Sequence, residues 1–268
     1  MKQPFQIIEP AAEQVPFILS IPHCGTAFPD ELVNEFNGEL IQAPDDTDWY
    51  VHQLYDFAAE MGITTIHAVY SRWVIDLNRD PEDKPLYSDG RIITGLCPVT
   101  NFFGESLYRD ERIAVRQEEV ERRRKLYYEP YHTALSSLIG KAKEAFGIAL
   151  VWDCHSIRQH VPTIRPERFP DLILGDADGT SASPGLIEAA IKKLENAGYD
   201  FSHNHPFKGG YITRHYGRPS LNQHALQLEM SKVNYMDDAE KYYHHGRAEK
   251  MRSLLRHTLG ELIDQLKG

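Results

Sequence analysis

The sequence has little of three things: cysteine, excess positive charge and long apolar runs. Its 268 residues include only three cysteines, an odd number, which argues against a disulfide framework and favours reduced thiols. Lysine and arginine number 29 against 39 acidic residues, so the net charge is −10 and the pI is about 5.7. Nucleic acids and anionic membranes favour basic surfaces, and we therefore expect neither as a partner.

The sequence also lacks the segments that direct a chain to a membrane. No stretch is long and apolar enough to predict a membrane span, and the residues after Met1 lack the apolar core of a secretion signal. We therefore expect a cytoplasmic protein that acts on a small molecule. Its oligomeric state is left open.

Hydrophobic residues make up 41% of the sequence, which is enough for a sizeable core, and we expect one domain over residues 1–268. Apolar runs of strand length alternate with helical periodicity, and this alternation predicts an α/β fold with a parallel sheet and crossover helices. Pro130 is expected to interrupt one helical stretch. The predicted strands are 17–21, 64–69, 73–77, 148–152, 171–174 and 224–229. The predicted helices are 48–61, 110–125, 131–146, 183–198 and 238–267.

Two histidines follow short apolar runs. Residues 17–21 lead to His23, and residues 148–152 lead to His155. Ligands and catalytic groups gather at the carboxyl ends of strands in an open α/β sheet, so both imidazoles are expected to meet at one point. This arrangement suits a metal ion.

A catalytic zinc site needs about three protein ligands and an open position for water, and histidine with carboxylate is a common set. The acidic residues 45–48 open the helix predicted after His23, so a carboxylate there can reach back to the metal. We choose Asp48, because the first helical turn holds it, and Asp46 is the alternative. Acidic residues at a helix start also fit the helix dipole alone. Asp153 can orient His155 or bind the metal itself.

A candidate general base lies in the predicted strand 224–229. A water activated by a metal still needs a proton acceptor that passes the proton to the leaving amine. Glu229 lies near the strand end beside Leu226 and Leu228, and desolvation there would raise its pKa into a useful range. We assign it this role. The alternative is that Glu229 faces solvent.

Arginine is suited to substrate carboxylates because its planar guanidinium binds two oxygens at once. Arg79 follows a predicted strand, and Arg91 and Arg214 lie in predicted loops. The loop 81–104 has the length and composition of a binding loop. Glycines at 209 and 210 permit a close backbone approach to a ligand, and Thr213 closes this segment. These residues are the candidates for substrate binding.

Two alternative sites are open. Cys24 and Cys154 neighbour the two key histidines, and Cys24 could pair with His155 as nucleophile and base, although buried cysteines are more often inert. His203 and His205 are a second possible metal pair. No clear strand precedes them, and we predict a loop there.

Six segments in order resemble the N-formylglutamate deformylase (N-formylglutamate amidohydrolase) family, from about residue 20 to residue 236. They are SIPHCG (20–25), DTDW (46–49), VIDLNRDP (74–81), DCHS (153–156), GGYITRHYG (209–217) and LQLEM (226–230). The resemblance implies hydrolysis of N-formyl-L-glutamate to formate and L-glutamate, a step in histidine degradation. It also implies a single domain with a mixed, largely parallel sheet flanked by helices, as in the related zinc carboxypeptidases and aspartoacylases.

The same resemblance implies roles for individual residues. In the related enzymes a glutamate ligand follows the first histidine by three residues, where this sequence has Thr26, so the carboxylate ligand must come from elsewhere. Asn78 and Arg79 are similar to the pair with which zinc carboxypeptidases hold a terminal carboxylate. Glu229 stands where their catalytic glutamate is expected.

The resulting hypothesis is a zinc amidohydrolase. His23, Asp48 and His155 hold the ion, Glu229 transfers the proton, and Arg79 holds a substrate carboxylate with help from Asn78, Arg91 or Arg214. The alternatives are another acyl-amino-acid hydrolase, such as a succinylglutamate desuccinylase or a small carboxypeptidase, and a non-catalytic metal-dependent binding module.

Overall fold

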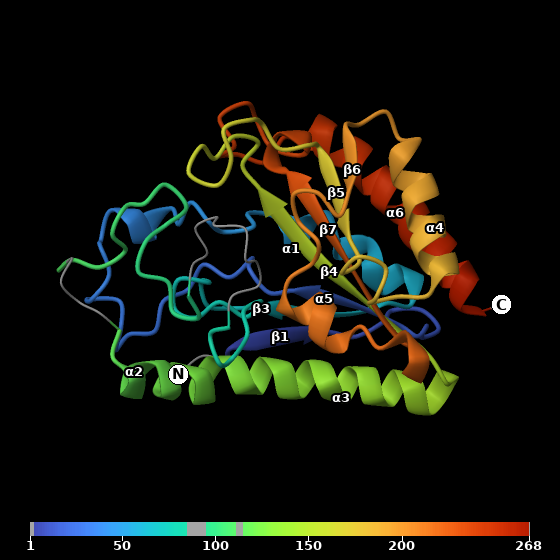
Figure 1. Ribbon diagram of the computed structural model, residues 1–268, viewed down its shortest axis with the longest axis horizontal. Coiled ribbons are helices and arrows are strands. Elements are labelled where there is room, and N and C mark those ends of the chain that lie inside the picture. The colour runs from blue at the N-terminus through green and yellow to red at the C-terminus, as the bar shows by residue number, and fades with distance from the viewer. Residues whose placement is uncertain (1–2, 85–94, 111–114, 268) are drawn as a thin grey trace.

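The computed structural model describes residues 3–84, 95–110 and 115–267, which form one seven-stranded sheet with helices on both faces (Figure 1). The strand order is β1-β3-β2-β4-β7-β5-β6. β1 is antiparallel to β3 and β5 is antiparallel to β7, while the other neighbouring pairs are parallel. The predicted mixed, largely parallel sheet is therefore confirmed. The strands are β1 (Phe5–Ile8), β2 (Phe17–Ile21), β3 (Thr64–Ala68), β4 (Ala149–Ile157), β5 (Leu172–Gly175), β6 (Phe201–His203) and β7 (Gln223–Ser231).

The helices form a layer on each side of the sheet. The long helix α3 runs along one face, and α4 and α6 lie side by side over the other (Figure 1). The helices are α1 (Val51–Leu54), α2 (Gln117–Arg123), α3 (Glu129–Phe146), α4 (Pro184–Glu195), α5 (Tyr211–Tyr216) and α6 (His245–Lys267). Short 3-10 turns are η1 (Leu40–Gln42), η2 (Asp56–Met61), η4 (Pro219–Leu221) and η5 (Lys232–Asn234), and η3 (Arg124–Tyr128) is a π-helical turn.

The central strands are buried on both faces, as expected for a sheet covered by two helical layers. In β4, Leu150, Trp152 and Cys154 join the cluster under α4 and α6, whereas Val151 joins the cluster under α3. Successive side chains of a strand point to opposite faces. Asp153 and His155 therefore lie on the α3 side of the sheet.

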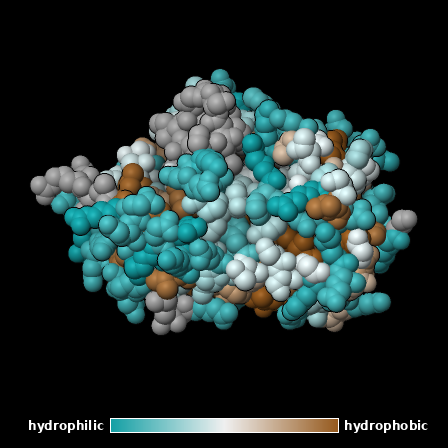
Figure 2. Space-filling model, turned by 60° about the horizontal axis from the view of Figure 1, so that its bottom comes forward, coloured by the Kyte–Doolittle hydropathy of each residue, from teal (hydrophilic) through white to brown (hydrophobic). Residues whose placement is uncertain are grey.

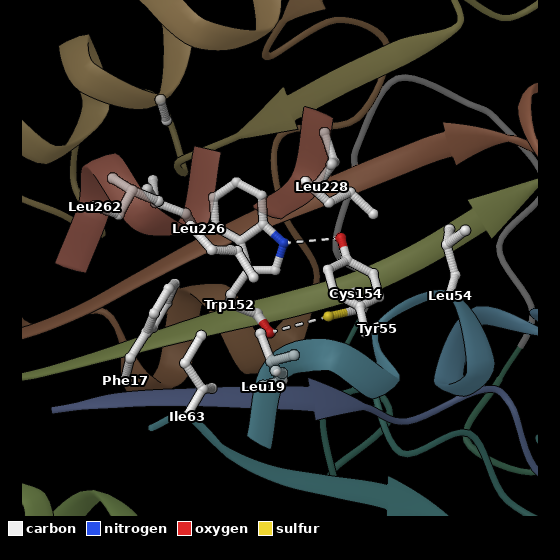
Figure 3. Packing of buried hydrophobic residues seen from close by; sticks show 14 of the residues in the cluster. Phe17, Leu19, Leu54, Tyr55, Ile63, Trp152, Cys154, Leu226, Leu228 and Leu262 are labelled. Carbon is white, nitrogen blue, oxygen red and sulfur yellow. Dashed lines mark hydrogen bonds between the residues drawn. The ribbon is translucent and has the colours of Figure 1, made fainter. Parts of the chain in front are cut away.

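Trp152 is the centre of the cluster under α4 and α6. Figure 3 shows its indole ring among apolar side chains that include Phe17 and Leu226, with its N–H donating to the hydroxyl of Tyr55 at 3.1 Å. A buried tryptophan with its polar atom satisfied contributes strongly, because truncation at such a site costs about 3–5 kcal/mol. This packing fixes β4, which carries His155 on its other face.

The prediction of a strand at 73–77 is wrong. The segment turns on itself, with the Val74 N–H donating to the Ser71 carbonyl at 2.9 Å, and its apolar side chains pack into the cluster under α3. The preceding strand, β3, already pairs with β1 on one edge and β2 on the other. The chain therefore cannot extend the sheet beside β3, and burial alone explains its apolar composition.

Several predicted boundaries also need correction. The helix predicted at 48–61 is only α1 followed by η2, and Tyr50 before it has a left-handed backbone with φ of 63°. The last helix begins at His245 and not at residue 238. Pro130 does not interrupt the helical stretch, because α2, η3 and α3 follow one another without a break and the π-helical turn at 124–128 accommodates the missing N–H of the proline.

The outer surface on the α3 side is mostly hydrophilic. Figure 2 shows hydrophobic residues on this face only as small patches separated by hydrophilic ones. Large exposed apolar patches mark docking surfaces, and this face has none in view. Within the described parts of the chain, no helix combines the length and the apolar character needed to cross a membrane.

Candidate active site

Strand register brings the candidate residues of β4 and β7 together. His155 and Glu229 are Cα partners on these two parallel strands, two residues beyond the Asp153 and Gln227 pair. Side chains of paired residues project from the same face of a sheet. The prediction that both strands deliver polar groups near their carboxyl ends therefore has a direct structural basis, although β4 continues through His155 to Ile157.

His23 reaches the same place from the neighbouring strand. It follows β2, which runs parallel to β4 with Ser20 opposite Asp153. The imidazole rings of His23 and His155 lie with their centroids 4.8 Å apart, and both side chains are buried. The expected meeting of the two imidazoles is therefore present.

Asp48 faces both histidines. Its Oδ2 lies 3.2 Å from Nδ1 of His155 and 3.8 Å from Nδ1 of His23, and its backbone N–H donates to the His23 carbonyl at 2.9 Å. Asp46 is directed elsewhere, since its carboxylate accepts hydrogen bonds from the Trp73 indole and the Phe102 backbone N–H. Of the two acidic candidates, the geometry puts Asp48 beside the imidazoles.

These three side chains could hold a metal ion. One ligand atom from each of His23, Asp48 and His155 lies within 4.8 Å of the others, and all three residues are buried. Nδ1 of His23 has no hydrogen-bond partner among the described residues, so a buried ring nitrogen points into the group unsatisfied. Two imidazoles and one carboxylate with an open position are a donor set that suits zinc.

The other nitrogen of each ring faces a carboxylate. Nε2 of His23 lies 2.7 Å from Asp76 and Nε2 of His155 lies 3.1 Å from Asp153. Carboxylates behind the ligand histidines fix the ring orientation and direct the lone pair of Nδ1 toward a metal. The carboxylates behind the two rings thus support metal binding through Nδ1 of both His23 and His155.

The electrostatics of the group favour a cation. Burial and the nearby Arg72 lower the pKa of His23 to about 4, so its ring is neutral at pH 7. Burial also opposes a charge on His155, but Asp153 and Asp48 outweigh it and raise the pKa of that ring. Carboxylates that favour a proton at this point favour a metal cation in the same way.

Glu229 lies at the edge of this group and is partly exposed. Burial raises its pKa to about 8, with His155 opposing this change and Asp48 adding to it. No hydrogen bond or ion pair joins its carboxyl group to another residue of the described chain. A carboxyl group with a raised pKa and no fixed partner is suited to proton transfer.

The substrate-binding candidates separate into buried and accessible groups. Asn78 is buried, with its Nδ2 donating to Asp153 at 3.0 Å and its Oδ1 accepting from the Ile212 N–H at 2.7 Å. Thr213 is also buried, and its hydroxyl lies 3.4 Å from the same Asp153 carboxylate. Both therefore brace the carboxylate behind His155.

The three arginine candidates differ in position. Arg79 has a side chain that is 17% exposed, with Nε 3.9 Å from Asp76. Arg214 is exposed and donates to the Gly209 carbonyl at 2.9 Å. Arg91 lies outside the described residues. Of the two arginine candidates that the structure describes, Arg79 is the one paired with an aspartate behind the histidines.

The backbone at residues 209–210 makes the predicted close approach, but it approaches a side chain of the protein itself and not a ligand. A Cβ atom on Gly210 would collide with the side-chain amide of Asn78. Only glycine leaves room for this contact, which lets the start of α5 bind the Asn78 side chain. The glycine therefore positions Asn78.

Sequence reasoning missed several charged residues that support the site. Arg72 donates to Asp76 at 2.5 Å and lies over the Phe102 ring, and its charge, together with the hydrogen bond between His23 and Asp76, outweighs burial to lower the pKa of Asp76. Lys232 is buried and donates to the Asp45 carbonyl at 2.8 Å, near Asp48. The available signal was the presence of Arg72 and Asp76 in an otherwise apolar run.

The cysteine alternative does not fit. The Sγ atom of Cys24 faces His67 and backbone carbonyls, while Cys154 points into the core under α4 and α6. Burial raises the pKa of both thiols, so the thiolate needed for attack is disfavoured. Neither thiol contacts His155 within the described residues.

The second histidine pair is also not a metal group. His203 ends β6, a strand where a loop was predicted, and its Nε2 lies 2.8 Å from Asp176. β6 runs opposite to β4 and β7, so it ends away from their carboxyl ends. Among the described residues, the cluster that could hold a metal ion is His23, Asp48 and His155.

Comparison with known proteins gives consistent similarities. The sequence model of N-formylglutamate amidohydrolase matches residues 15–236. An N-formylglutamate deformylase of Pseudomonas aeruginosa is 43% identical over 254 residues, and one of Pseudomonas putida is 40% identical over 252 residues, each covering 93% of both chains. The crystal structure of an N-formylglutamate amidohydrolase from Ralstonia eutropha superposes with a TM-score of 0.82 at 27% identity, covering 99% of both chains.

Proposed function

This chain belongs to the N-formylglutamate amidohydrolase family and hydrolyses N-formylglutamate, and we propose that it does so at a metal ion held by His23, Asp48 and His155. Water adds across the amide bond, and the products are formate and L-glutamate. Residues 1–268 act as one catalytic domain. The observation that carries the proposal is the convergence of both Nδ1 atoms on Oδ2 of Asp48.

The protein supplies the ligands and their orientation. Asp76 and Asp153 hold the two imidazole rings from behind, and Asn78 and Thr213 in turn hold Asp153. When bound, a zinc ion would polarise the formyl oxygen and make water a stronger nucleophile. Burial of the whole group keeps bulk water away and strengthens these interactions.

Glu229 transfers the proton from the water to the leaving amine. Its carboxylate accepts a proton from the attacking water and returns it to the amide nitrogen, so that the C–N bond breaks with a neutral amine leaving. The raised pKa of Glu229 suits both halves of this transfer, because the protonated form is then a usable acid near neutral pH. Its partly exposed position leaves the carboxyl group accessible to a substrate.

Substrate carboxylates are held by arginine. Arg79 directly follows Asn78, which is hydrogen bonded to the carboxylate behind His155, so a group bound by Arg79 lies close to the reacting amide. Asn78, Arg214 or Arg91 assists Arg79. An acidic protein needs such local positive charge to hold a dianionic substrate.

The proposal is tested by L-glutamate release from N-formyl-, N-acetyl- and N-succinyl-L-glutamate, measured side by side on purified protein. We expect the largest kcat/KM for the formyl substrate, loss of activity after chelation and recovery with zinc. Asp48→Asn should lower the bound metal content, while Asp176→Asn, a matched change at the His203 contact, should not. Full activity of metal-free protein, with inactivation by a thiol reagent, would contradict the proposal.

A further inference from the structure

Residues 77–79 belong to no helix or strand, yet three successive backbone carbonyls in this segment accept hydrogen bonds. The Leu77 carbonyl lies 2.9 Å from Nε2 of His132, and the Arg79 carbonyl accepts from the Tyr128 hydroxyl at 2.8 Å. Between them, the Asn78 carbonyl accepts from the Tyr211 N–H at 3.3 Å. The backbone of the segment that carries Asn78 and Arg79 is therefore fixed by hydrogen bonds at successive residues, as the backbone of a strand is.

The two side-chain donors lie on one face of the helix beside this segment. Tyr128 ends the π-helical turn η3, and His132 lies four residues later in α3. Their rings stack with centroids 4.1 Å apart, and both residues are buried. Residues four apart on a helix share a face, so the pair forms one surface toward residues 77–79.

The π-helical turn sets the angle at which Tyr128 leaves the helix. Pro130 has no N–H to donate back to the preceding turn, and the regular hydrogen-bond pattern is replaced by a wider turn at 124–128. Single π turns are frequent at functional sites. Here the turn ends at the residue whose hydroxyl reaches the Arg79 carbonyl.

His132 is fixed as a donor to Leu77. A carbonyl oxygen only accepts, so Nε2 carries the hydrogen, and Nδ1 is left as an unprotonated acceptor 3.0 Å from the Tyr216 hydroxyl, which also lies 3.2 Å from the His132 carbonyl. Burial lowers the pKa of His132 to about 4, which keeps the ring neutral with a single N–H at pH 7. The direction of this hydrogen bond is therefore determined.

We propose that Tyr128 and His132 are positioning residues that hold the backbone of residues 77–79 and, through Arg79, set the affinity for the dicarboxylate substrate. The inference rests on the proposed role of Arg79 in binding a substrate carboxylate. Neither ring needs to touch the substrate. A guanidinium on a loosely held backbone loses more freedom when it binds, and that loss weakens binding of the substrate and of the transition state alike.

Tyr128→Phe tests the inference, because it removes one hydroxyl and leaves the ring. We expect the KM for N-formyl-L-glutamate to rise about fivefold, the factor that corresponds to one net hydrogen bond, with kcat within about twofold. Tyr127→Phe is the matched control. Tyr127 lies in the same π turn, but its hydroxyl donates to Glu31 at 2.8 Å and not to residues 77–79. An unchanged KM in Tyr128→Phe would overturn the inference.

A double-mutant cycle with Arg79→Ala separates this inference from the proposed function. We expect Arg79→Ala alone to raise KM more than Tyr128→Phe does, and the second change to add nothing further in that background. If the two effects multiply, Tyr128 does not act through Arg79 and the positioning role is wrong, while the role of Arg79 stands. If Arg79→Ala leaves KM unchanged, the proposed role of Arg79 fails, and this inference with it.

A second pair of variants tests the same segment from the Leu77 side. His132→Gln keeps an N–H donor near the position of Nε2, whereas His132→Leu removes it. We expect the leucine variant to raise KM and the glutamine variant to restore most of the wild-type value. Equal KM values for the two variants would show that the hydrogen bond to Leu77 does not position the segment.

Discussion

His155 and Glu229 are direct partners across the β4 and β7 pair, with their side chains on the same face of the sheet. The proposed metal ligand and the proposed proton acceptor thus come from the same point of two adjacent parallel strands. Their separation is set by the strand spacing of about 4.8 Å, which does not depend on loop conformation. A substrate amide bound at the proposed metal group would therefore lie next to Glu229.

Replacing Glu229 by glutamine should remove the proton acceptor without changing the shape of the site. We expect kcat to fall by about 10²- to 10⁴-fold, the usual contribution of a positioned general base, with the bound metal content unchanged. Formate release and metal analysis of the same preparation measure both quantities. Glu188→Gln, on the exposed side of α4, is the control and should retain wild-type kcat. Full activity of Glu229→Gln would contradict the assignment of Glu229 as the general base.

The positions of His23, His155 and Glu229 could be predicted because each depends on local patterns. An apolar run gives a strand, parallel strands end at a common edge, and alternation decides the face on which a side chain lies. These rules do not depend on loop conformation. The parallel core of the sheet and the convergence of the two histidines follow from the same rules, whereas the mixed character of the sheet was implied only by the family resemblance.

The choice between Asp46 and Asp48 could not be decided in this way. The helix expected to hold Asp48 begins only at Val51, after a left-handed Tyr50, so helical periodicity does not apply to the acidic segment. What directs Asp48 inward is its backbone hydrogen bond to the His23 carbonyl, a contact between loops. Loop contacts of this kind leave no periodic signal in a sequence.

The charged residues that support the site could not be predicted for a related reason. Residues 73–77 look like a strand, since a buried irregular segment and a buried strand have the same composition. The ion pair between Asp76 in this segment and Arg72 just before it, and the buried Lys232, become meaningful only when the chain places them beside Asp48 and His23. The charges are visible in the sequence, but their neighbours are not.

Removal of the carboxylate behind His23 should weaken metal binding. Asp76 lies 2.7 Å from Nε2 of His23 and also pairs with the buried Arg72. For Asp76→Asn we expect zinc affinity to fall by about 10- to 100-fold, as for other partners of ligand histidines. The buried Arg72 also loses its partner, so the free energy of unfolding of the metal-free protein should fall by about 3 kcal/mol or more.

Zinc titration and denaturant unfolding measure these two effects separately. Asp176→Asn serves as the control for zinc affinity, because Asp176 contacts His203 and not a residue of the metal group. Wild-type zinc affinity in Asp76→Asn would show that the carboxylate does not support His23.

The stability of the protein should depend on pH through His132. Its pKa is about 4 in the folded chain, with burial as the main cause and His215 adding to it, against about 6.5 when unfolded. Between these values the unfolded chain binds more protons, so stability is lost as the pH falls from about 6.5 toward 4. The loss attributable to this residue is about 2 kcal/mol at pH 5 and approaches about 3 kcal/mol below pH 4.

His132→Gln keeps a donor to Leu77 but cannot take up a proton in this range. We expect urea unfolding of this variant to show a smaller decrease in stability between pH 7 and pH 5 than the wild type, by about 2 kcal/mol. His257→Gln, at an exposed position on α6, should keep the wild-type decrease. The comparison is made on metal-free protein, so that proton uptake by the metal group is common to all three chains. If the glutamine variant loses as much stability as the wild type, the His132 ring is not held neutral between Leu77 and Tyr216.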